Sequence, residues 1–179
     1  MAYPDWEHFP KNRAPENLVK SIVKVFSSHA KEIDTTKAKN RLKSNEILQI
    51  VSEKLLKIEG MQVEFRGENG TLKKIARPVL YGANGKPRKS FNPDGYHDNT
   101  GLILEIEAGM TVPNNMMYKD LIKACLMEGT NHFVLAVPLH YDGGGNNSKP
   151  YEVVIREFTA IFESSRLQLP LDTVTVIGY

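Results

Sequence analysis

Three carboxylates that lie close together in the sequence are the side chains most suited to chemistry. Asp94 lies between a proline and a glycine, and Glu105 and Glu107 follow the apolar residues 102–104. Alternate residues of a strand point to one side, so Glu105 and Glu107 are expected to share a face. If residues 98–101 close a β-hairpin, Asp94 lies opposite them. Three carboxylates beside an apolar sheet repel one another unless a cation neutralises them, so the pattern predicts a divalent-metal site.

Each of these acids also has a simpler interpretation. Asp94 belongs to a Pro-Asp-Gly sequence, which is typical of a turn. Glu107 is at the expected end of a strand, where acids commonly face water. Glu105 directly follows three apolar residues, and this favours a partly buried, functional carboxylate. With Glu-x-Glu downstream, we interpret Asp94 as a metal ligand.

The composition is that of an ordinary globular protein. A chain of 179 residues with 41% hydrophobic and 25% charged residues fits one domain, 1–179, with a core of its own. The single cysteine, Cys125, excludes an intramolecular disulfide and suits a reducing cytoplasm. No apolar run approaches the ~18 residues of a membrane span. The first residues lack the charged and apolar regions of a signal peptide, so we expect a cytoplasmic protein.

Basic residues gather just before the acids. Between residues 71 and 90 there are six basic residues and no acid. A basic stretch beside an acidic pocket suits a polyanion held over a metal, although a solvated hairpin would show the same composition. The candidate nucleic-acid-binding residues are Lys73, Lys74, Arg77, Lys86, Arg88 and Lys89.

Hydrophobic periodicity and turn residues predict the elements that position these side chains. Ser44 is the expected N-cap of the helix before the acids, and residues 141–148 are expected to form a flexible loop. The predicted fold class is α/β, with a mixed β-sheet core and helices on both faces. Helices are expected over residues 15–30, 44–60, 116–127 and 151–166, and strands over 61–66, 75–81, 132–139 and 174–177, besides the hairpin that carries the acids.

The order of helix, strands, Pro-Asp, about ten residues, Glu-x-acid, helix and strand resembles the PD-(D/E)xK nuclease superfamily, which has the restriction-endonuclease-like fold. The resemblance covers roughly residues 44–139, with an N-terminal helix and a C-terminal helix and strand as additions. It implies that Asp94 and Glu105 bind Mg²⁺, for which Mn²⁺ is expected to substitute, with help from the backbone carbonyl of Ile106. The implied activity is hydrolysis of DNA phosphodiester bonds.

The sequence departs from this family's motif at its last position, where Glu107 replaces the usual lysine. Some restriction endonucleases are similar in having glutamate there, where it acts as base or second-metal ligand. Alternatively, Lys119 on the following helix takes the role of a displaced lysine. The resemblance also implies an acid on the helix before the first strand. Glu46 is the best match and Glu53 a weaker one, while an ordinary acid at the helix N-terminus explains Glu46 equally well.

Several other functions have weaker support. The alternative in closest contention is a nuclease-like fold that cleaves little or nothing and binds nucleic acid or a protein. His97 and His140 lack the spaced partners of a zinc site, and Gly143–Gly145 lacks the rest of a phosphate loop. A glycosidase is disfavoured because Trp6 offers little as a sugar platform. The resemblance further implies a homodimer, since family members of this size that cut duplex DNA often pair one site with each strand.

Overall fold

The computed structural model describes residues 3–37, 42–67, 70–109, 111–143, 146–164 and 166–179. Its helices are α1 (Asn17–Ser28), α2 (Ala30–Ile33), α3 (Ser44–Leu55), α4 (Met116–Leu126) and α5 (Pro150–Ser164), with a 3₁₀ turn at η1 (Ala83–Gly85). Its strands are β1 (Asp5–Phe9), β2 (Met61–Val63), β3 (Phe65–Arg66), β4 (Leu72–Lys73), β5 (Arg77–Tyr81), β6 (Pro87–Phe91), β7 (Gly95–His97), β8 (Leu102–Ile106), β9 (His132–Val137), β10 (Tyr141–Gly143), β11 (Asn146–Ser148) and β12 (Thr173–Gly178).

A mixed six-stranded sheet forms the centre of the molecule, with the strand order β1-β12-β9-β8-β7-β2. The strands β12, β9 and β8 run parallel to one another, and β1, β7 and β2 are each antiparallel to a neighbour. Every residue of β8, β9 and β12 is buried. Strands covered on both faces need apolar residues throughout, which explains the continuous run 133–137 in β9.

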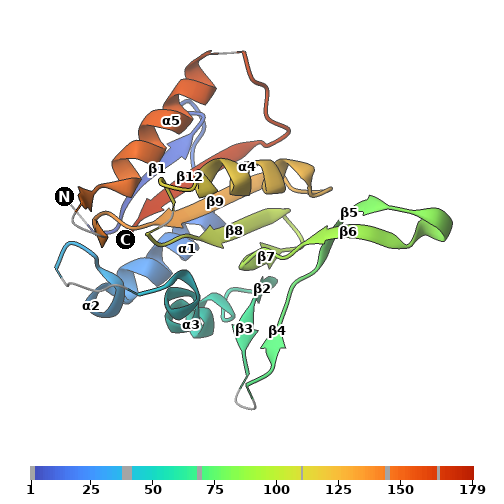
Figure 1. Cartoon of the computed structure of the whole chain (residues 1–179), viewed down its shortest axis with the longest axis horizontal. Helices are drawn as coiled ribbons and strands as arrows, with labels where there is room; N and C mark the ends of the chain where they lie inside the picture. The colour runs from blue at the N-terminus through green and yellow to red at the C-terminus, as the bar shows by residue number, and fades with distance from the viewer. Residues whose placement is uncertain (1–2, 38–41, 68–69, 110, 144–145, 165) are drawn as a thin grey trace.

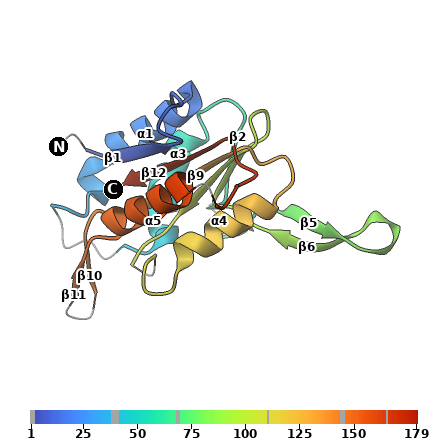
Figure 2. The same ribbon diagram turned by 90° about the horizontal axis from the view of Figure 1, so that it is seen from above.

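Helices cover the sheet on both sides (Figures 1 and 2). One core packs α1 and α3 against the side of the sheet that carries Leu102, Leu104 and Ile106. The other packs α4 and α5 against the opposite side, which carries Ile103 and Tyr96. Successive side chains of β8 therefore alternate between the two cores, as the strand period of two requires. The predicted α/β class with helices on both faces is confirmed.

Two hairpins extend away from the body of the molecule. In both views the β5–β6 hairpin projects beyond α4 as an arm, and Figure 1 shows the β3–β4 hairpin descending below the sheet. Each hairpin is a separate two-stranded sheet. The face of the central sheet that carries α4 thus borders the base of the β5–β6 arm.

The predicted elements are mostly present, and the differences have local causes. The predicted strand 61–66 divides into β2, which pairs with β7 in the central sheet, and β3, which leaves that sheet and pairs with β4. Ser44 is the first helical residue of α3 and not its cap, a position that Lys43 takes. β1 was not predicted, because its sequence has no clear apolar alternation.

The expectation of a flexible loop over residues 141–148 is wrong. This stretch contains β10 and β11, which pair antiparallel with Tyr141 opposite Ser148. The side chain of Ser148 also donates to the carbonyl of Tyr141 at 3.3 Å. Of the Gly143–Gly145 run, residues 144 and 145 lie outside the described part of the chain. Within that described part, no helix is both long and apolar enough to cross a membrane.

Candidate functional site

The β7–β8 hairpin brings Asp94 to the level of Glu105. Gly95 lies opposite Leu104 in the antiparallel register, so the residue before Gly95 meets the residue after Leu104. The hairpin closes where the Gly101 amide donates to the carbonyl of His97 at 2.9 Å. Gly101 has a φ of +64°, and a Cβ at this residue would lie 1.9 Å from the carbonyl oxygen of Gly129. Only glycine fits this turn, which fixes the register of the acids.

The carboxylate of Asp94 is held by a backbone amide of the neighbouring strand. Its Oδ2 accepts a hydrogen bond from the Ile106 amide at 2.7 Å. A turn aspartate bonds to amides two residues further on in its own turn, whereas this bond reaches 12 residues along the chain. The side chain of Asp94 is therefore anchored at the end of β8, between Glu105 and Glu107.

Glu105 is buried and has a lysine as its ionic partner. The residue is 5% exposed, although a glutamate is almost never this buried without a partner. The Nζ atom of Lys123, on α4, lies 3.3 Å from Oε1 of Glu105. The same Nζ lies 2.5 Å from Oδ1 of Asp120, one turn earlier on α4. Lys123 thus links α4 to Glu105 of β8 by an ion pair.

Asp120 is a further carboxylate of this cluster and is fully buried. Its side chain contributes to the face of α4 that packs on the sheet, among Met117, Leu121 and Ala124. Within the described residues, neither carboxylate oxygen of Asp120 has a complete hydrogen bond. Its Oδ1 is paired with Lys123, and Asp120 is also close enough to Glu107 to raise the pKa of that acid. A buried carboxylate that shares its one lysine with Glu105 is costly without a further cation or donor.

Burial and mutual repulsion raise the pKa values of the acids. Burial raises the pKa of Asp94 to about 7, and Glu64 and Asp120 add to the rise. Burial, with Asp94 nearby, raises the pKa of Glu105 well above its ordinary value. Burial raises the pKa of Glu107 to about 8, with a further contribution from Asp120.

Lys123 is the cation that faces these acids. Burial alone would lower the pKa of Lys123, but Glu105 and Asp120 raise it above its ordinary value, so its side chain stays charged. One ammonium group faces four carboxylates in this cluster, those of Asp94, Glu105, Glu107 and Asp120. We call this cluster of four acids and Lys123 the carboxylate site. It has a large excess of negative charge when its acids are ionised.

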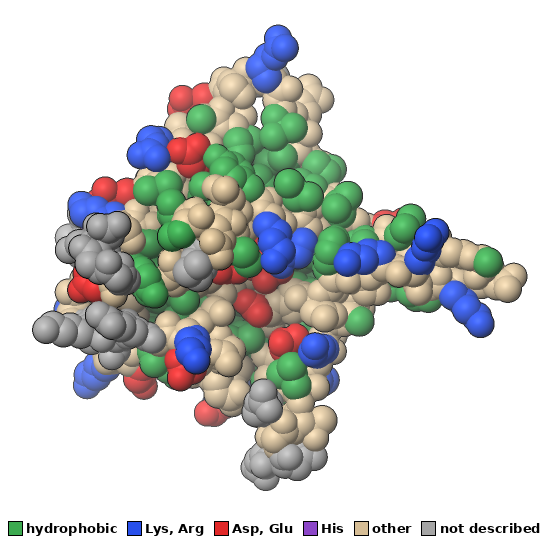
Figure 3. Space-filling model, viewed as in Figure 1, with side chains coloured by type: hydrophobic (Ala, Val, Ile, Leu, Met, Phe, Trp, Pro, Cys, Tyr) green, Lys and Arg blue, Asp and Glu red, His purple; other side chains and the backbone are tan. Residues whose placement is uncertain are grey.

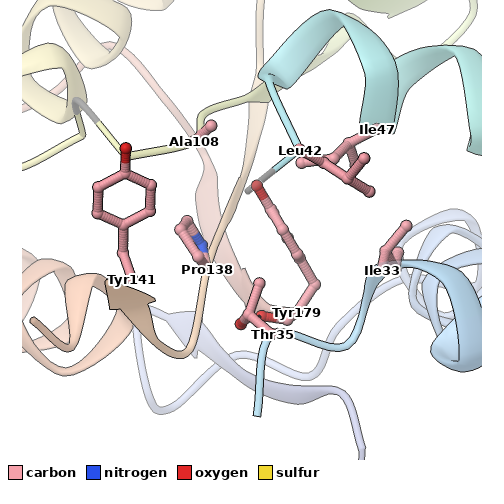
Figure 4. A pocket seen from close by; sticks show the side chains of 8 residues that line it. All are labelled: Ile33, Thr35, Leu42, Ile47, Ala108, Pro138, Tyr141 and Tyr179. Carbon is pink, nitrogen blue, oxygen red and sulfur yellow. The ribbon is translucent and has the colours of Figure 1, made fainter. Parts of the chain in front are cut away.

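The backbone of Glu107 is fixed by Tyr179. The hydroxyl group of Tyr179 donates to the carbonyl of Glu107 at 2.5 Å, and the tyrosine is 1% exposed. Figure 4 shows its ring between Ile47 and Pro138. The space left beside the ring is about 10 Å³, which holds at most one water molecule. Tyr179 therefore holds the end of β8 in place, and the pocket around its ring leaves no room for a ligand.

Other predicted residues have contacts away from the carboxylate site. Glu46 is exposed, and its Oε2 accepts from the Lys43 amide at 2.6 Å, which caps α3. Its role as an outer acid stays a prediction. Glu53 is also exposed and pairs with Lys57 at 2.6 Å. Lys119 is close to Met116 Sδ, at 3.9 Å, so Lys123 is the lysine of α4 that contacts Glu105.

The predicted nucleic-acid-binding residues lie on the two projecting hairpins. Lys73 is in β4, with its Nζ 5.8 Å from the ring centre of Phe65, and Lys74 follows it. Arg77, at the base of the arm, lies over the ring of Tyr96 at 3.9 Å and pairs with Asp98 at 3.7 Å. The remaining three, Lys86, Arg88 and Lys89, are exposed along the arm.

Figure 3 shows how the charges divide on this face of the molecule. Acidic side chains gather in a hollow near its centre, and basic side chains border the hollow and continue along the arm. Among the described residues, Lys86, Arg88 and Lys89 form no ion pair, so their charge is available to a partner. The arrangement presents basic residues around an acidic centre.

Both histidines considered for zinc have other surroundings. His97 Nδ1 lies 3.0 Å from the hydroxyl of Thr100, and its Nε2 lies 2.9 Å from the carbonyl of Glu59. Both ring nitrogens are thus occupied by local contacts. His140 lies apart from the carboxylate site, beside Asp34 and Lys149.

Sequence reasoning missed Asp120, Lys123 and Glu64. The signal for Asp120 was a charged residue inside an apolar helical stripe, since it precedes Leu121 and follows Met117 by three positions. Lys123 lies three residues further along the same face of the helix. Glu64 carries no signal of its own, because its approach to Asp94 depends on how β2 pairs with β7.

The donor set of the carboxylate site fits a hard divalent cation. Among the described residues, no three His, Cys, Asp or Glu side chains are close enough to hold one ion by themselves. Mg²⁺ needs fewer protein ligands, because it is usually held by one or two carboxylates and keeps several waters. One lysine shared by Glu105 and Asp120, and the raised pKa values of Asp94 and Glu107, are the pattern expected of acids crowded around too few positive charges.

Comparison with known proteins gives one distant structural match. No family model matches the chain, and no curated protein matches it. A solved structure, the restriction endonuclease BglII complexed with a DNA 16-mer, is similar with a TM-score of 0.47 and 9% sequence identity. The match covers 98% of this chain and 75% of that chain. A similarity this distant assigns no function, which has to be inferred from the carboxylate site itself.

Proposed function

We propose that the protein is a Mg²⁺-dependent endonuclease that hydrolyses phosphodiester bonds in DNA. The observation that carries this proposal is the convergence of Asp94, Glu105 and Glu107 with Asp120 around the single ammonium group of Lys123. Four carboxylates with one cation are suited to a divalent metal, which can in turn bind an anionic substrate, and they are poorly suited to an apolar ligand.

In this proposal Asp94 and Glu105 hold the ion, with the carbonyl of Ile106. The hydrogen bond from the Ile106 amide keeps one oxygen of Asp94 at the end of β8 and leaves Oδ1 to face the ion. The bound metal would activate a water molecule and neutralise charge that develops on the phosphate. Asp120 supplies a further carboxylate from α4, which would hold a second ion or a metal-bound water.

In this proposal two residues take the roles of the usual motif lysine, Lys123 as the positive charge and Glu107 as the group that acts on the attacking water. Lys123 holds a positive charge beside Glu105, where it would contact a phosphate oxygen of the substrate. Glu107 is half-exposed and has a pKa of about 8 without metal, near the pH at which a general base works best. We assign it the proton of the attacking water. The basic residues of the arm would hold the DNA backbone.

The test is cleavage of supercoiled plasmid and of circular single-stranded DNA, each with MgCl₂ or with EDTA. Wild type is expected to nick DNA with Mg²⁺ or Mn²⁺ only. Glu105→Gln should cleave at least about 100-fold more slowly, because a metal ligand and a neighbour of Lys123 are lost together. Glu152→Gln, an exposed acid of α5 paired with Lys149, is the matched control and should cleave normally.

A nucleic-acid-binding protein without cleavage is the second candidate. The observation in its favour is Glu107 at the motif position of the lysine, with Lys123 already engaged by two acids. DNA binding that is equal with Mg²⁺ and EDTA, with no cleavage of either substrate, would support this candidate and contradict the nuclease. The proposed homodimer is tested by sedimentation with and without DNA.

A further inference from the structure

A groove beside the carboxylate site has a lining that the proposed chemistry does not use. It lies between the base of the β5–β6 arm and α4, with a volume of about 680 Å³. The groove is shallow and open to solvent. Its walls join the carboxylate site at two points, since Lys123 lines the groove and contacts Glu105, and Asn92 lies two residues before Asp94.

The lining combines aromatic rings, amides and lysines. Phe91 and Tyr118 contribute rings from opposite walls, Asn92 and Asn115 contribute amide groups, and Lys119 contributes positive charge. None of the described lining residues is acidic. A ligand with a flat ring system and a negative charge satisfies all three kinds of residue, and a nucleotide is such a ligand. An apolar peptide would leave the lysines and amides without partners.

The ring of Tyr118 is held in place before any ligand binds. Its hydroxyl group donates to Oε2 of Glu157, on α5, at 2.8 Å. The hydrogen bond is at the far end of the ring, and the ring is half-buried against the core that packs α4 and α5 on the sheet, so contacts at both places hold it. An aromatic side chain fixed in this way loses little entropy when a base stacks on it.

The β5–β6 arm continues outward from the groove wall that Ser90 and Phe91 form (Figure 1). Leu80 lies opposite Lys89 in the β5–β6 register, and the Nζ of Lys89 lies 5.3 Å from the ring centre of Phe91. Lys89 and Phe91 therefore share one face of the arm. Leu80 and Tyr81 expose 52% and 53% of their surface near the tip. A strand that follows this face meets lysines and apolar surface before it reaches the groove.

We infer that the groove seats an unpaired nucleobase of the substrate strand, next to the phosphate held at the carboxylate site. In a duplex the faces of each base are covered by the neighbouring bases. Phe91 and Tyr118 can therefore stack only on a base that is unstacked. The preferred substrate is therefore single-stranded DNA or a duplex with unpaired nucleotides. This inference rests on the proposed function for the position of the phosphate.

The experiment measures binding without cleavage. Fluorescence anisotropy in EDTA compares a labelled single-stranded oligonucleotide with the same oligonucleotide annealed to its full complement as a blunt duplex, for wild type, Tyr118→Ala and Tyr118→Phe. Tyr118→Ala should weaken single-strand binding about 5- to 100-fold, the effect of losing one stacked base, and Tyr118→Phe should stay within about twofold. Leu126→Ala, two turns further along α4 and 54% exposed, is the control outside the groove and should bind normally.

A second readout reports the base itself. A 2-aminopurine placed in the single strand should change its fluorescence on binding wild type and much less on binding Tyr118→Ala. If Tyr118→Ala does not fold, Lys119→Glu takes its place as the test variant. It changes an exposed residue of the groove wall and should also weaken binding.

The outcomes separate this inference from the nuclease. Tyr118-dependent single-strand binding without Mg²⁺-dependent cleavage supports the groove and contradicts the nuclease. Cleavage with no loss of affinity in Tyr118→Ala or Lys119→Glu overturns the groove alone. Tighter binding of the duplex than of the single strand also overturns it. No binding of either DNA by wild type overturns both.

Discussion

The carboxylate site and the β5–β6 arm carry opposite charges, and the charges of the first are buried while those of the second are exposed. Asp120 and Glu105 are buried and crowded, whereas Lys86, Arg88 and Lys89 are exposed and spread along a thin ribbon. Burial changes the pKa values of the acids, while solvent screens the basic residues. The comparison separates chemistry from affinity: the first region is expected to set the rate of cleavage, and the second the strength of DNA binding.

The largest effect is expected for Asp94→Asn. Cleavage should fall about 1,000-fold or more because a metal ligand is lost, while DNA binding in EDTA should stay near that of wild type. The asparagine oxygen can still accept from the Ile106 amide, and one charge of a repelling cluster is removed. The Tm in EDTA at pH 8 should therefore rise by about 2–4 °C, near 1 kcal/mol. A loss of binding equal to the loss of cleavage would contradict the division between the two regions.

The two lysines of α4 sharpen the comparison within one helix. Lys123→Ala should slow cleavage about 10- to 100-fold, because the charge beside Glu105 and the substrate phosphate is lost. Lys119→Ala keeps that charge and should instead weaken binding by about tenfold or less. Steady-state cleavage and anisotropy on both variants check this. If Lys119→Ala had the larger effect on the cleavage rate, the displaced-lysine role would pass to Lys119.

The arm is tested by removing its three exposed charges together. The triple change of Lys86, Arg88 and Lys89 to Ala should weaken DNA binding about tenfold or more and reduce the slope of log K against log salt by about 2. The cleavage rate at saturating DNA should be nearly unchanged. The control is Lys57→Ala. This exposed lysine follows α3, on the side of the sheet opposite α4, and pairs with Glu53. An unchanged salt slope would place the DNA elsewhere on the protein.

The pH dependence of stability is a smaller effect that reports the acids directly. The pKa values of about 7 for Asp94 and about 8 for Glu107 are above those of the unfolded chain, so the folded protein without metal binds more protons between those limits. This stabilisation is fully present below pH ~4 and is lost as pH rises through 7 to 8. In EDTA, Tm should fall by roughly 5 °C between pH 6 and 8.5.

Mg²⁺ or Mn²⁺ should restore much of this Tm at pH 8.5 and change little at pH 6, where protons already neutralise the acids. Asp94→Asn should flatten the metal-free dependence. A Tm in EDTA that rises with pH over this range would show that the acids are not crowded as described.

The hairpin acids could be predicted because strand geometry is local. The period of two places Glu105 and Glu107 on one side, and a glycine-closed turn brings Asp94 opposite. Asp120 and Lys123 depend on how α4 docks on the sheet, and that contact joins residues far apart in the sequence. Their pattern is visible as a charged residue inside the apolar stripe of a helix, but the stripe alone does not say which strand it faces.

The α/β fold class could be predicted from the pattern of helices and one continuous apolar strand. The strands at the edges of the sheet could not be predicted. β1 pairs with β12, and Asp5 meets Gly178 across 173 positions. Its sequence has no period of two that marks a strand. The β5–β6 arm was predicted as strand and turn, but its projection from the body depends on the absence of a sheet neighbour, which no local pattern encodes.

The most direct test of the central claim is a crystal soaked in MnCl₂ and measured near the manganese absorption edge. The account predicts an anomalous peak between the carboxylates of Asp94 and Glu105, beside the Ile106 carbonyl, and its loss in Asp94→Asn. A wild-type crystal with no peak there, and with the acids still paired to Lys123 and the Ile106 amide alone, would contradict it.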